Sequence, residues 1–355
     1  MKSSWSKRLA YGFFIMVFLL LAGCGNQAAE SNQQAGGAGK SQDSGKTYKF
    51  KLGFNTNEQS VRYEAAKKFK DAVEEKTNGR VEIQIFPSET LGTEQEMLES
   101  VKIGALDFQL AGGGSMTNIL PQYGTLQLPF MINGYDEAYA VLDGPIGDRW
   151  KKEAEEFGYK VLAHADLGFA QITNNKHPIK SPEDIAGVKM RSPNEPTSIE
   201  TFNQLGAITS TIPFSELYLA LSQGVVDGQF NPLDAIYDQK FYEVQKYLAI
   251  TNHFYYHINF IMNKGLWDSL DPELQTIIQD AANEARDLSR ELTQKRNSEV
   301  LDSMKANFEE ITEPDIAAFR AKVEPAYAKL ADIVGKQNFE EVQKFLEEYR
   351  ATHKK

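Results

Sequence analysis

Short apolar runs that end abruptly at polar residues mark the centre of this chain. Two of them stop at Arg191 and at Asn231, and each predicts a brief strand with its polar residue at the strand end. Between these runs, apolar residues spaced three or four apart predict a helix at 214–221, with Ser215 as its N-cap and Gly224 as its stop. A cation at the end of one strand and an amide at the end of the next indicate a site for a small anion.

The same kind of pattern predicts an α/β fold for most of the chain. Alternating residues at 48–54 and 80–86 predict strands, and helical spacing at 62–77 between them completes a βαβ unit with a parallel pair. A long apolar stripe after Asp271 predicts a helix that extends towards Met304, with Asp271 as its N-cap. Further strands are expected at 105–110, 159–163 and 168–174, and further helices at 94–103, 136–142, 145–157, 314–333 and 338–353.

Composition limits the classes of function. A chain of 355 residues with 41% hydrophobic and 25% charged residues is long enough for two packed lobes. The formal net charge of -11 argues against a nucleic-acid partner, which would need a basic face. It does not exclude an anionic ligand, because one buried arginine sets the potential inside a cleft. The single cysteine excludes an intrachain disulfide.

Residues 1–24 are predicted to be a targeting segment. A basic start precedes an apolar run at 10–21, which is shorter than the roughly 20 residues that cross a bilayer core and is typical of a signal peptide. The tetrapeptide at 21–24 resembles the bacterial lipobox, and this resemblance implies cleavage before Cys24 and acylation of its thiol. An ordinary signal peptide or an uncleaved anchor is the alternative. Residues 25–46 are small and polar, and they predict a flexible tether.

Three features that resemble catalytic or metal sites lack the residues that would complete them. The glycines at 112–114 are not followed by the Lys and Ser or Thr of a phosphate loop, so we expect them to leave room at the mouth of a cleft. His164 and Asp166 fall on one side of a strand, but no nucleophile accompanies them at a recognisable spacing. His253 and His257 are four residues apart in a segment without helical pattern or a third ligand. We therefore expect no catalytic residue, no metal and no cofactor.

The chain closely resembles the solute-binding subunits of tripartite ATP-independent periplasmic (TRAP) transporters. The segments that carry the resemblance are 79–81, 91–92, 128–130, 178–179, 182–185, 187–191, 214–221, 226–229, 231–232 and 240–248. The resemblance implies a two-lobed α/β fold like that of periplasmic binding proteins, with a cleft between the lobes and the long helix spanning both. We expect one lobe to comprise 47–167 with 257–296, and the other 168–256 with 297–355.

The resemblance also implies a binding site for an organic acid. Arg191 matches the arginine that clamps the ligand carboxylate, and Asn231 matches the residue that donates to the same group. A planar guanidinium fits this role because it meets a carboxylate with two charge-assisted hydrogen bonds. A surface or interlobe salt bridge is the alternative for Arg191. Phe230 is either a packing residue or a wall for an apolar ligand face. Further candidate ligand contacts are Asn55, Glu58, Glu89, Gln171, Asn174 and Phe214.

Departures from the family pattern bear on which acid binds. Some sialate-binding members carry a second arginine where this chain has Ala170, and other sugar contacts where it has Gly112 and Ser115, so sialic acid is not expected. The sequence offers one arginine for a carboxylate, many polar candidate contacts and the space left by the glycines. Together these features favour a monocarboxylate with hydroxyls, such as a uronate or another sugar acid. A C4-dicarboxylate is the closest alternative, although the sequence offers no clear second cation for it.

The resulting hypothesis is a monomeric lipoprotein on the outer face of the bacterial cell membrane. It captures a small organic acid and delivers it to the small and large membrane subunits of a TRAP transporter. A ligand-sensing lipoprotein for a membrane receptor would share the binding site without the transporter. An exported enzyme such as a cell-wall hydrolase would need a paired acid and base, which the sequence does not show.

Overall fold

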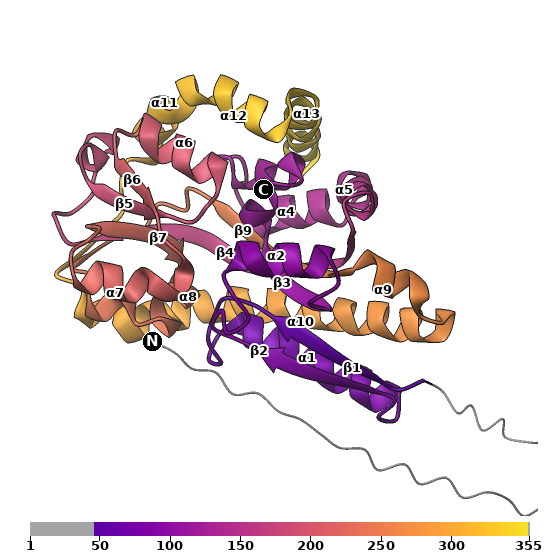
Figure 1. Cartoon of the computed structure of the whole chain (residues 1–355). Coiled ribbons are helices and arrows are strands. Elements are labelled where there is room, and N and C mark those ends of the chain that lie inside the picture. Colours follow the sequence, from indigo (N-terminus) through magenta and orange to yellow (C-terminus); the bar gives the residue numbers. More distant parts are fainter. Residues whose placement is uncertain (1–45, 354–355) are drawn as a thin grey trace, which may run out of the picture. The chain divides into compact units, whose positions relative to one another are not determined.

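A single long strand, β4 (Tyr159–Asn174), passes through two sheets (Figure 1). Its first part pairs antiparallel with β9 (Tyr255–Asn263), and its last part pairs antiparallel with β7 (Gly228–Pro232) and β8 (Tyr247–Ala249). The register with β9 shifts twice along β4. The two strands predicted at 159–163 and 168–174 are therefore one continuous strand. The alternation of side chains along the sequence was interrupted where the register with β9 shifts.

The first sheet has the order β2, β1, β3, β9 and the first part of β4. Strands β1 (Tyr48–Gly53) and β2 (Val81–Phe86) are parallel and connected by helix α1 (Val61–Lys76), as predicted. Strand β3 (Phe108–Gly112) is parallel to β1 and antiparallel to β9. Ser60 caps α1 by accepting a hydrogen bond from the amide of Tyr63, which satisfies a helix donor that has no partner inside the helix.

The second sheet has the last part of β4, β7, β5 (Lys189–Ser192) and β6 (Ile208–Thr211) in that order. Strand β8 pairs with β4 and with β10 (Glu310–Thr312). Strand β5 is parallel to both β6 and β7. Arg191 and Asn231 therefore lie near the same ends of parallel strands, where side chains from successive strands meet.

Helix α10 (Pro272–Met304) has 33 residues and contacts α1, β4 and α8, which belong to different parts of the fold (Figure 1). Asp271 caps it, as predicted, by accepting from the amide of Leu274. The remaining helices are α2 (Glu94–Lys102), α3 (Gly113–Met116), α4 (Tyr135–Leu142), α5 (Pro145–Glu155), α6 (Pro196–Gln204), α7 (Leu217–Ser222), α8 (Leu233–Asp238), α9 (Lys264–Ser269), α11 (Ile316–Val323), α12 (Tyr327–Val334) and α13 (Lys336–Thr352). Short 3-10 turns are η1 (Pro121–Gln127), η2 (Pro182–Ile185), η3 (Phe214–Glu216), η4 (Phe241–Glu243), η5 (Lys305–Asn307) and η6 (Glu324–Ala326).

Two helix predictions need correction. Ser215 is not an N-cap, because residues 214–216 form the turn η3 and α7 starts only at Leu217. Gly224 does follow α7 with a φ of 68°, the left-handed conformation of a helix stop. The helix predicted at 314–333 is interrupted by η6, which contains Pro325 and separates α11 from α12.

The computed structural model describes residues 46–353, apart from the side chain of Ser298. The predicted signal peptide at 1–24 with Cys24, and the predicted tether at 25–46 except for Lys46, lie outside the described residues. The described residues fall in one compact unit, so the lobe boundaries predicted within it stay predictions.

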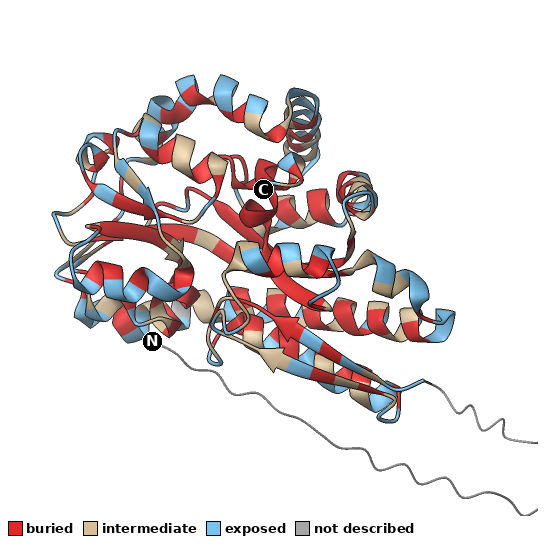
Figure 2. Cartoon of the chain, viewed as in Figure 1, coloured by how far each residue is buried: buried red, intermediate tan, exposed pale blue. Residues whose placement is uncertain are grey.

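Buried residues follow both sheets and the inner faces of the helices around them (Figure 2). One apolar cluster extends from Phe50 and Phe69 beside the first sheet to Ile172 and Phe230 in the second. The two sheets therefore share a core through β4. Among the described residues, no helix combines the length and apolar character that a membrane crossing requires.

Candidate functional site

A cavity of about 290 Å³ lies where segments from the two sheets meet. Its walls combine charged, amide, hydroxyl and apolar groups. The lining residues are Asn55, Thr56, Arg62, Glu89, Thr93, Glu94, Gln95, Gly112, Ser115, Leu167, Arg191, Pro193, Asn194, Glu195, Thr211, Ile212, Pro213, Phe214, Asn231, Ala235 and Tyr256. Five of the predicted ligand contacts are in this set, namely Asn55, Glu89, Arg191, Phe214 and Asn231.

Arg191 projects from β5 and is only 3% exposed. Its Nε donates to the carbonyl oxygen of Ile212 at 2.9 Å, and its guanidinium lies 5.8 Å from the centre of the Phe214 ring. Within residues 46–353, neither terminal nitrogen of the fork has a hydrogen-bond or ion-pair partner. Burial lowers the pKa of Arg191, and the nearby Glu195 opposes that effect. The arginine thus presents an uncommitted, charged fork to the cavity.

Asn231 lies beside the cavity near the end of β7, and its Nδ2 donates to Gln229 Oε1. Gln171 is directly opposite Asn231 in the pairing of β4 with β7, yet its side chain is occupied elsewhere. Its Oε1 accepts from the amides of Thr251 and Asn252 at 2.8 and 3.1 Å. Gln171 lines a second cavity of about 480 Å³ and not the first.

Three other predicted contacts are outside the lining of the first cavity. Asn174 is buried at the end of β4, where its Oδ1 accepts from the amides of Lys176 and His177. Glu58 is exposed in the loop before α1. Phe230 is 1% exposed and packs in the apolar core. The structure therefore brings together the residues at the strand ends and leaves these three apart from them.

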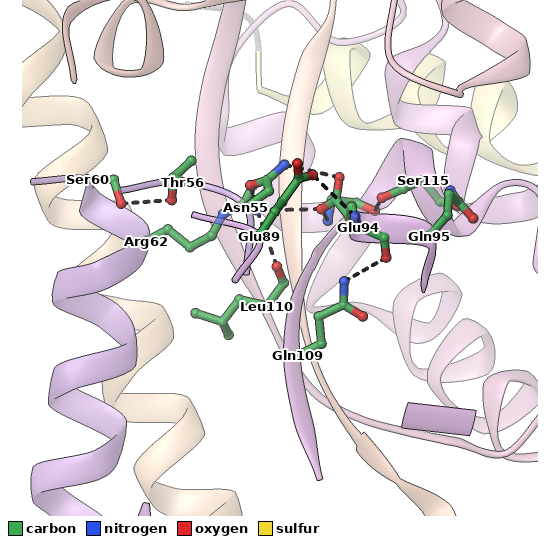
Figure 3. Close-up of polar contacts among 11 residues, drawn as sticks. Asn55, Thr56, Ser60, Arg62, Glu89, Glu94, Gln95, Gln109, Leu110 and Ser115 are labelled. Atoms are coloured by element: carbon green, nitrogen blue, oxygen red, sulfur yellow. Dashed lines mark hydrogen bonds and ion pairs between the residues drawn. The ribbon is translucent and has the colours of Figure 1, made fainter. Parts of the chain in front are cut away.

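Arg62 is a second guanidinium in the cavity wall that the sequence analysis missed (Figure 3). It is 4% exposed, and its Nη1 donates to Asn55 Oδ1 and to the carbonyl oxygen of Leu110. The same nitrogen lies 3.5 Å from Glu94 Oε1. A cation in the first turn of a helix opposes the helix dipole, and this conflict was the available sequence signal.

Glu94 and Glu89 form the acidic part of that wall (Figure 3). Glu94 accepts from the amide of Gly112 at 2.8 Å and from Asn55 Nδ2 at 3.2 Å. Glu89 has a φ of 56° and accepts from the amide of Glu94 at 3.2 Å. Its other oxygen accepts from the amide of Ser215 in η3 at 3.0 Å. Both carboxylates are therefore held by several donors.

Glu195 is a third carboxyl group in the lining, and no sequence pattern pointed to it. It is 3% exposed, and its Oε2 accepts from the hydroxyls of Tyr256 and Ser198, each at 2.9 Å. Gln127 Nε2 lies 3.5 Å from the same oxygen. Burial raises the pKa of Glu195 to about 7, Glu94 adds to the rise, and the hydrogen bonds and Arg191 oppose it.

The glycine run has the predicted place at the cavity only at Gly112. Gly112 lines the cavity, but Gly113 and Gly114 make room for protein side chains. A Cβ at position 113 would lie 2.0 Å from His257, and one at 114 would lie 2.6 Å from Glu195 Oε1. These two glycines therefore allow buried polar side chains to approach the backbone.

Comparison with known proteins identifies the family. Residues 52–333 match the family described as bacterial extracellular solute-binding protein, family 7. The chain belongs to this family. It is 35% identical over 270 residues to the 2,3-diketo-L-gulonate-binding periplasmic protein of Escherichia coli, a match that covers 76% of this chain and 82% of the relative.

Solved structures agree with this assignment. A TRAP periplasmic solute-binding protein from a Polaromonas species, bound to D-erythronate, has a TM-score of 0.80 and 33% identity, covering 84% of this chain and 98% of that one. A TRAP solute-binding protein from Sulfurospirillum deleyianum, with bound succinate, has a TM-score of 0.79 and 30% identity over 83% and 98% of the two chains. The predicted family and two-lobed α/β fold are confirmed. The chain is a TRAP solute-binding protein for small organic acids and not an enzyme.

Three histidines of this solute-binding protein, His164, His253 and His257, are buried away from the cavity lining. His164 Nδ1 lies 2.7 Å from Asn259 Oδ1, and the carboxylate of Asp166 accepts from Tyr139. Burial lowers the pKa of His253 and of His257 to about 3, so both stay neutral at ordinary pH. The described part of the chain contains no group of three or more His, Cys, Asp or Glu residues that could hold a metal ion.

Proposed function

We propose that the protein binds a monocarboxylate sugar acid, with Arg191 and Asn231 holding the carboxylate. The observation that supports this proposal most directly is the uncommitted fork of Arg191 in the wall of the cavity. A buried guanidinium without a carboxylate partner costs free energy, which two charge-assisted hydrogen bonds to a ligand would offset. Asn231 adds an amide at the end of the neighbouring strand β7.

The acidic wall formed by Glu89 and Glu94 favours a ligand that has hydroxyl groups at the end opposite its carboxylate. Carboxylate and amide groups of Glu89, Glu94 and Asn55 present hydrogen-bond acceptors to the cavity. A second carboxylate on the ligand would meet these like charges, and Arg62 is already paired with Glu94. A C4-dicarboxylate is therefore the less favoured ligand, although a solved relative binds succinate. Two other relatives are described as binding 2,3-diketo-L-gulonate and D-erythronate, and these sugar acids support the proposal.

A thermal-shift measurement tests the ligand class. The purified protein is heated with D-erythronate, D-galactonate, D-glucuronate and succinate, each at the same concentration. We expect at least one sugar acid to raise the Tm more than succinate does, because bound ligand stabilises only the folded state. A larger shift with succinate would replace the sugar-acid proposal with a dicarboxylate one.

We further propose that the protein is anchored through Cys24 and delivers its ligand to TRAP membrane subunits. The lipobox-like sequence at 21–24 and the family membership support this placement. Growth with labelled palmitate should label the wild type and not Cys24→Ala, and the variant should leave the membrane fraction. Label in the variant would rule out Cys24 as the acylated residue. If the protein serves transport, cells that lack the TRAP membrane subunits should lose ligand uptake. Unchanged uptake would favour the ligand-sensing role.

A further inference from the structure

The cavity for an anionic ligand carries more negative than positive groups. Its charged lining consists of the guanidinium groups of Arg62 and Arg191 and the carboxyl groups of Glu89, Glu94 and Glu195. With every group ionised, the lining has one excess negative charge before any ligand enters. A carboxylate ligand adds another in a buried space, where repulsion is weakly screened.

Two of the three carboxyl groups, Glu89 and Glu94, accept hydrogen bonds at both carboxylate oxygens. Glu94 accepts from the backbone of Gly112, from Asn55 and from Arg62. Glu89 accepts one backbone N–H at each of its two oxygens. The protein therefore already supplies a donor to every oxygen of these two groups.

Glu195 differs in where its partners lie. Tyr256, Ser198 and Gln127 all approach Oε2. From residues 46–353, no donor reaches Oε1, and the residue lines the cavity. One oxygen is thus fixed by the protein, while the other lies beside Gly114 and has no donor among the described residues. This arrangement suits a carboxylic acid that accepts at one oxygen and donates from the other.

We propose that Glu195 contacts the ligand beside Arg191 as a neutral carboxyl, so that each organic anion is bound together with one proton. The inference rests on the proposed function, because it requires an anion at Arg191. In the binding step, the Glu195 carboxylate takes one proton from solvent at Oε1, and that O–H donates to an oxygen of the ligand. No other bond forms or breaks.

Charged and neutral side chains both face Glu195. They come from five elements: Arg191 from β5, Glu94 from α2, Tyr256 from β9, Ser198 from α6 and Gln127 from η1. Ser198 and Gln127 do not ionise. Burial raises the pKa of Tyr256 well above 10, so its phenol stays neutral, and the guanidinium stays charged. Burial places the pKa of Glu195 at about 7, within the range where solvent protons are available.

Proton uptake makes ligand affinity depend on pH in a defined direction. The negative ligand raises the pKa of Glu195 further, so the complex holds more protons than the free protein above about pH 6. Affinity is then constant below about pH 6 and falls as pH rises above 7, by up to about tenfold per pH unit. Replacing Glu195 with a neutral side chain removes this dependence.

Calorimetry tests the inference on the whole protein. D-erythronate, or D-galactonate if erythronate gives no heat, is titrated at pH 7.5 in phosphate and in Tris, which release very different heats of ionisation. The difference in observed heat counts the protons taken up, and we expect about half a proton or more per ligand. For Glu195→Gln we expect no uptake and a Kd that stays constant from pH 6 to 8.5.

Glu200→Gln is the matched control, because Glu200 is on helix α6, which directly follows Glu195, and pairs with Lys329 outside the cavity. It should retain the proton uptake of the wild type. If the wild type binds the ligand without proton uptake, or if Glu195→Gln binds it with unchanged proton uptake, this inference is wrong. The proposed function would still stand in either case. The wild-type measurement decides even if the variant fails to fold. If none of the tested acids binds, the proposed function and this inference both fall.

Discussion

Phe230 lies face to face with Phe202, with ring centroids 4.6 Å apart and planes 10° apart. Both rings are buried, and the edges of His253 and Phe254 close the stack. Stacked and edge-to-face rings at these distances add to the free energy of burial. The geometry therefore favours packing over ligand contact among the two roles considered for Phe230.

Replacing Phe230 should change stability and leave binding intact. We expect Phe230→Leu to lower the free energy of unfolding by about 1–3 kcal/mol, because the substitution removes the stack and leaves a gap. The Kd for the ligand should stay within about twofold. Phe214→Leu is the contrasting variant, since Phe214 lines the cavity beside Arg191 and should change the Kd more than the Tm. A large change of Kd in Phe230→Leu would contradict this assignment.

The shape of the arginine fork should matter as well as its charge. We expect Arg191→Lys to weaken ligand binding at least about tenfold, because an ammonium group lacks the planar pair of donors. Lys189→Ala, an exposed position on the same strand, serves as the control and should bind normally. Isothermal titration of the three proteins makes the comparison. If Arg191→Lys and the wild type bind the ligand with equal affinity, the proposal that Arg191 holds the carboxylate through two hydrogen bonds is wrong.

The buried carboxyl of Glu195 should make stability depend on pH without any ligand. Its pKa is raised from 4.5 to about 7 by burial, so its contribution to stability is present at low pH and lost as pH rises through 7. Glu195→Gln removes a cost of up to about 3 kcal/mol at pH 8 and almost none at pH 4. Urea unfolding at the two pH values should show stabilisation at pH 8 only. An effect independent of pH would mean that Glu195 does not titrate in this range.

Arg296 of α10 joins elements attached to both sheets. It lies 3.0 Å from Asp234 and 3.0 Å from Asp238 of α8, and it donates to the carbonyl oxygen of Gln59 before α1. Burial and the charge of Asp234 raise the pKa of Asp238 to about 7. Removing the guanidinium leaves two buried carboxyl groups without a counter-charge.

We therefore expect Arg296→Ala to lose about 3–5 kcal/mol of stability at pH 8 and less at pH 5, where the aspartates take up protons. Urea unfolding at both pH values measures the loss. Arg286→Ala on the same helix should cost less than about 1 kcal/mol, because its partner Asp287 is exposed. A similar loss of stability in the two variants would show that the buried cluster contributes no more to the free energy of unfolding than an exposed ion pair does.

Gly114 should tolerate no side chain. An added Cβ would lie 2.0 Å from Gln127 Oε1 and 2.6 Å from Glu195 Oε1, so we expect Gly114→Ala to cost about 1–3 kcal/mol and to weaken ligand binding. Gly134→Ala is the control, because its Cβ would meet no atom within 4 Å and its φ is -169°. Thermal unfolding and titration of both variants give the comparison. Normal behaviour of Gly114→Ala would mean that Glu195 moves freely.

The sequence predicted what depends on local pattern. The βαβ unit, the long helix capped by Asp271 and the strand ends at Arg191 and Asn231 all follow from periodicity and turn residues. Irregular pairing concealed the continuity of β4, since register shifts break the alternation of side chains.

The part of the site that was missed depends on contacts between distant segments. Arg62 reaches Glu94 and Leu110, and Glu195 reaches Tyr256, so the contacts that bring these residues to the site leave no local signal in the sequence. Gln171 was predicted as a ligand contact only because it is one of several polar side chains expected near the cleft. Its amide is in fact taken by Thr251 and Asn252, some 80 positions away in the chain.

The passage of β4 through both sheets has a consequence for the history and engineering of this protein. A fragment that ends within β4 would expose an unpaired strand edge, and such edges promote aggregation. Recombination therefore cannot exchange one half for that of a relative without rebuilding the shared strand. New ligand preferences in this scaffold are expected to arise by substitution of single cavity residues, while the backbone of both halves is inherited together.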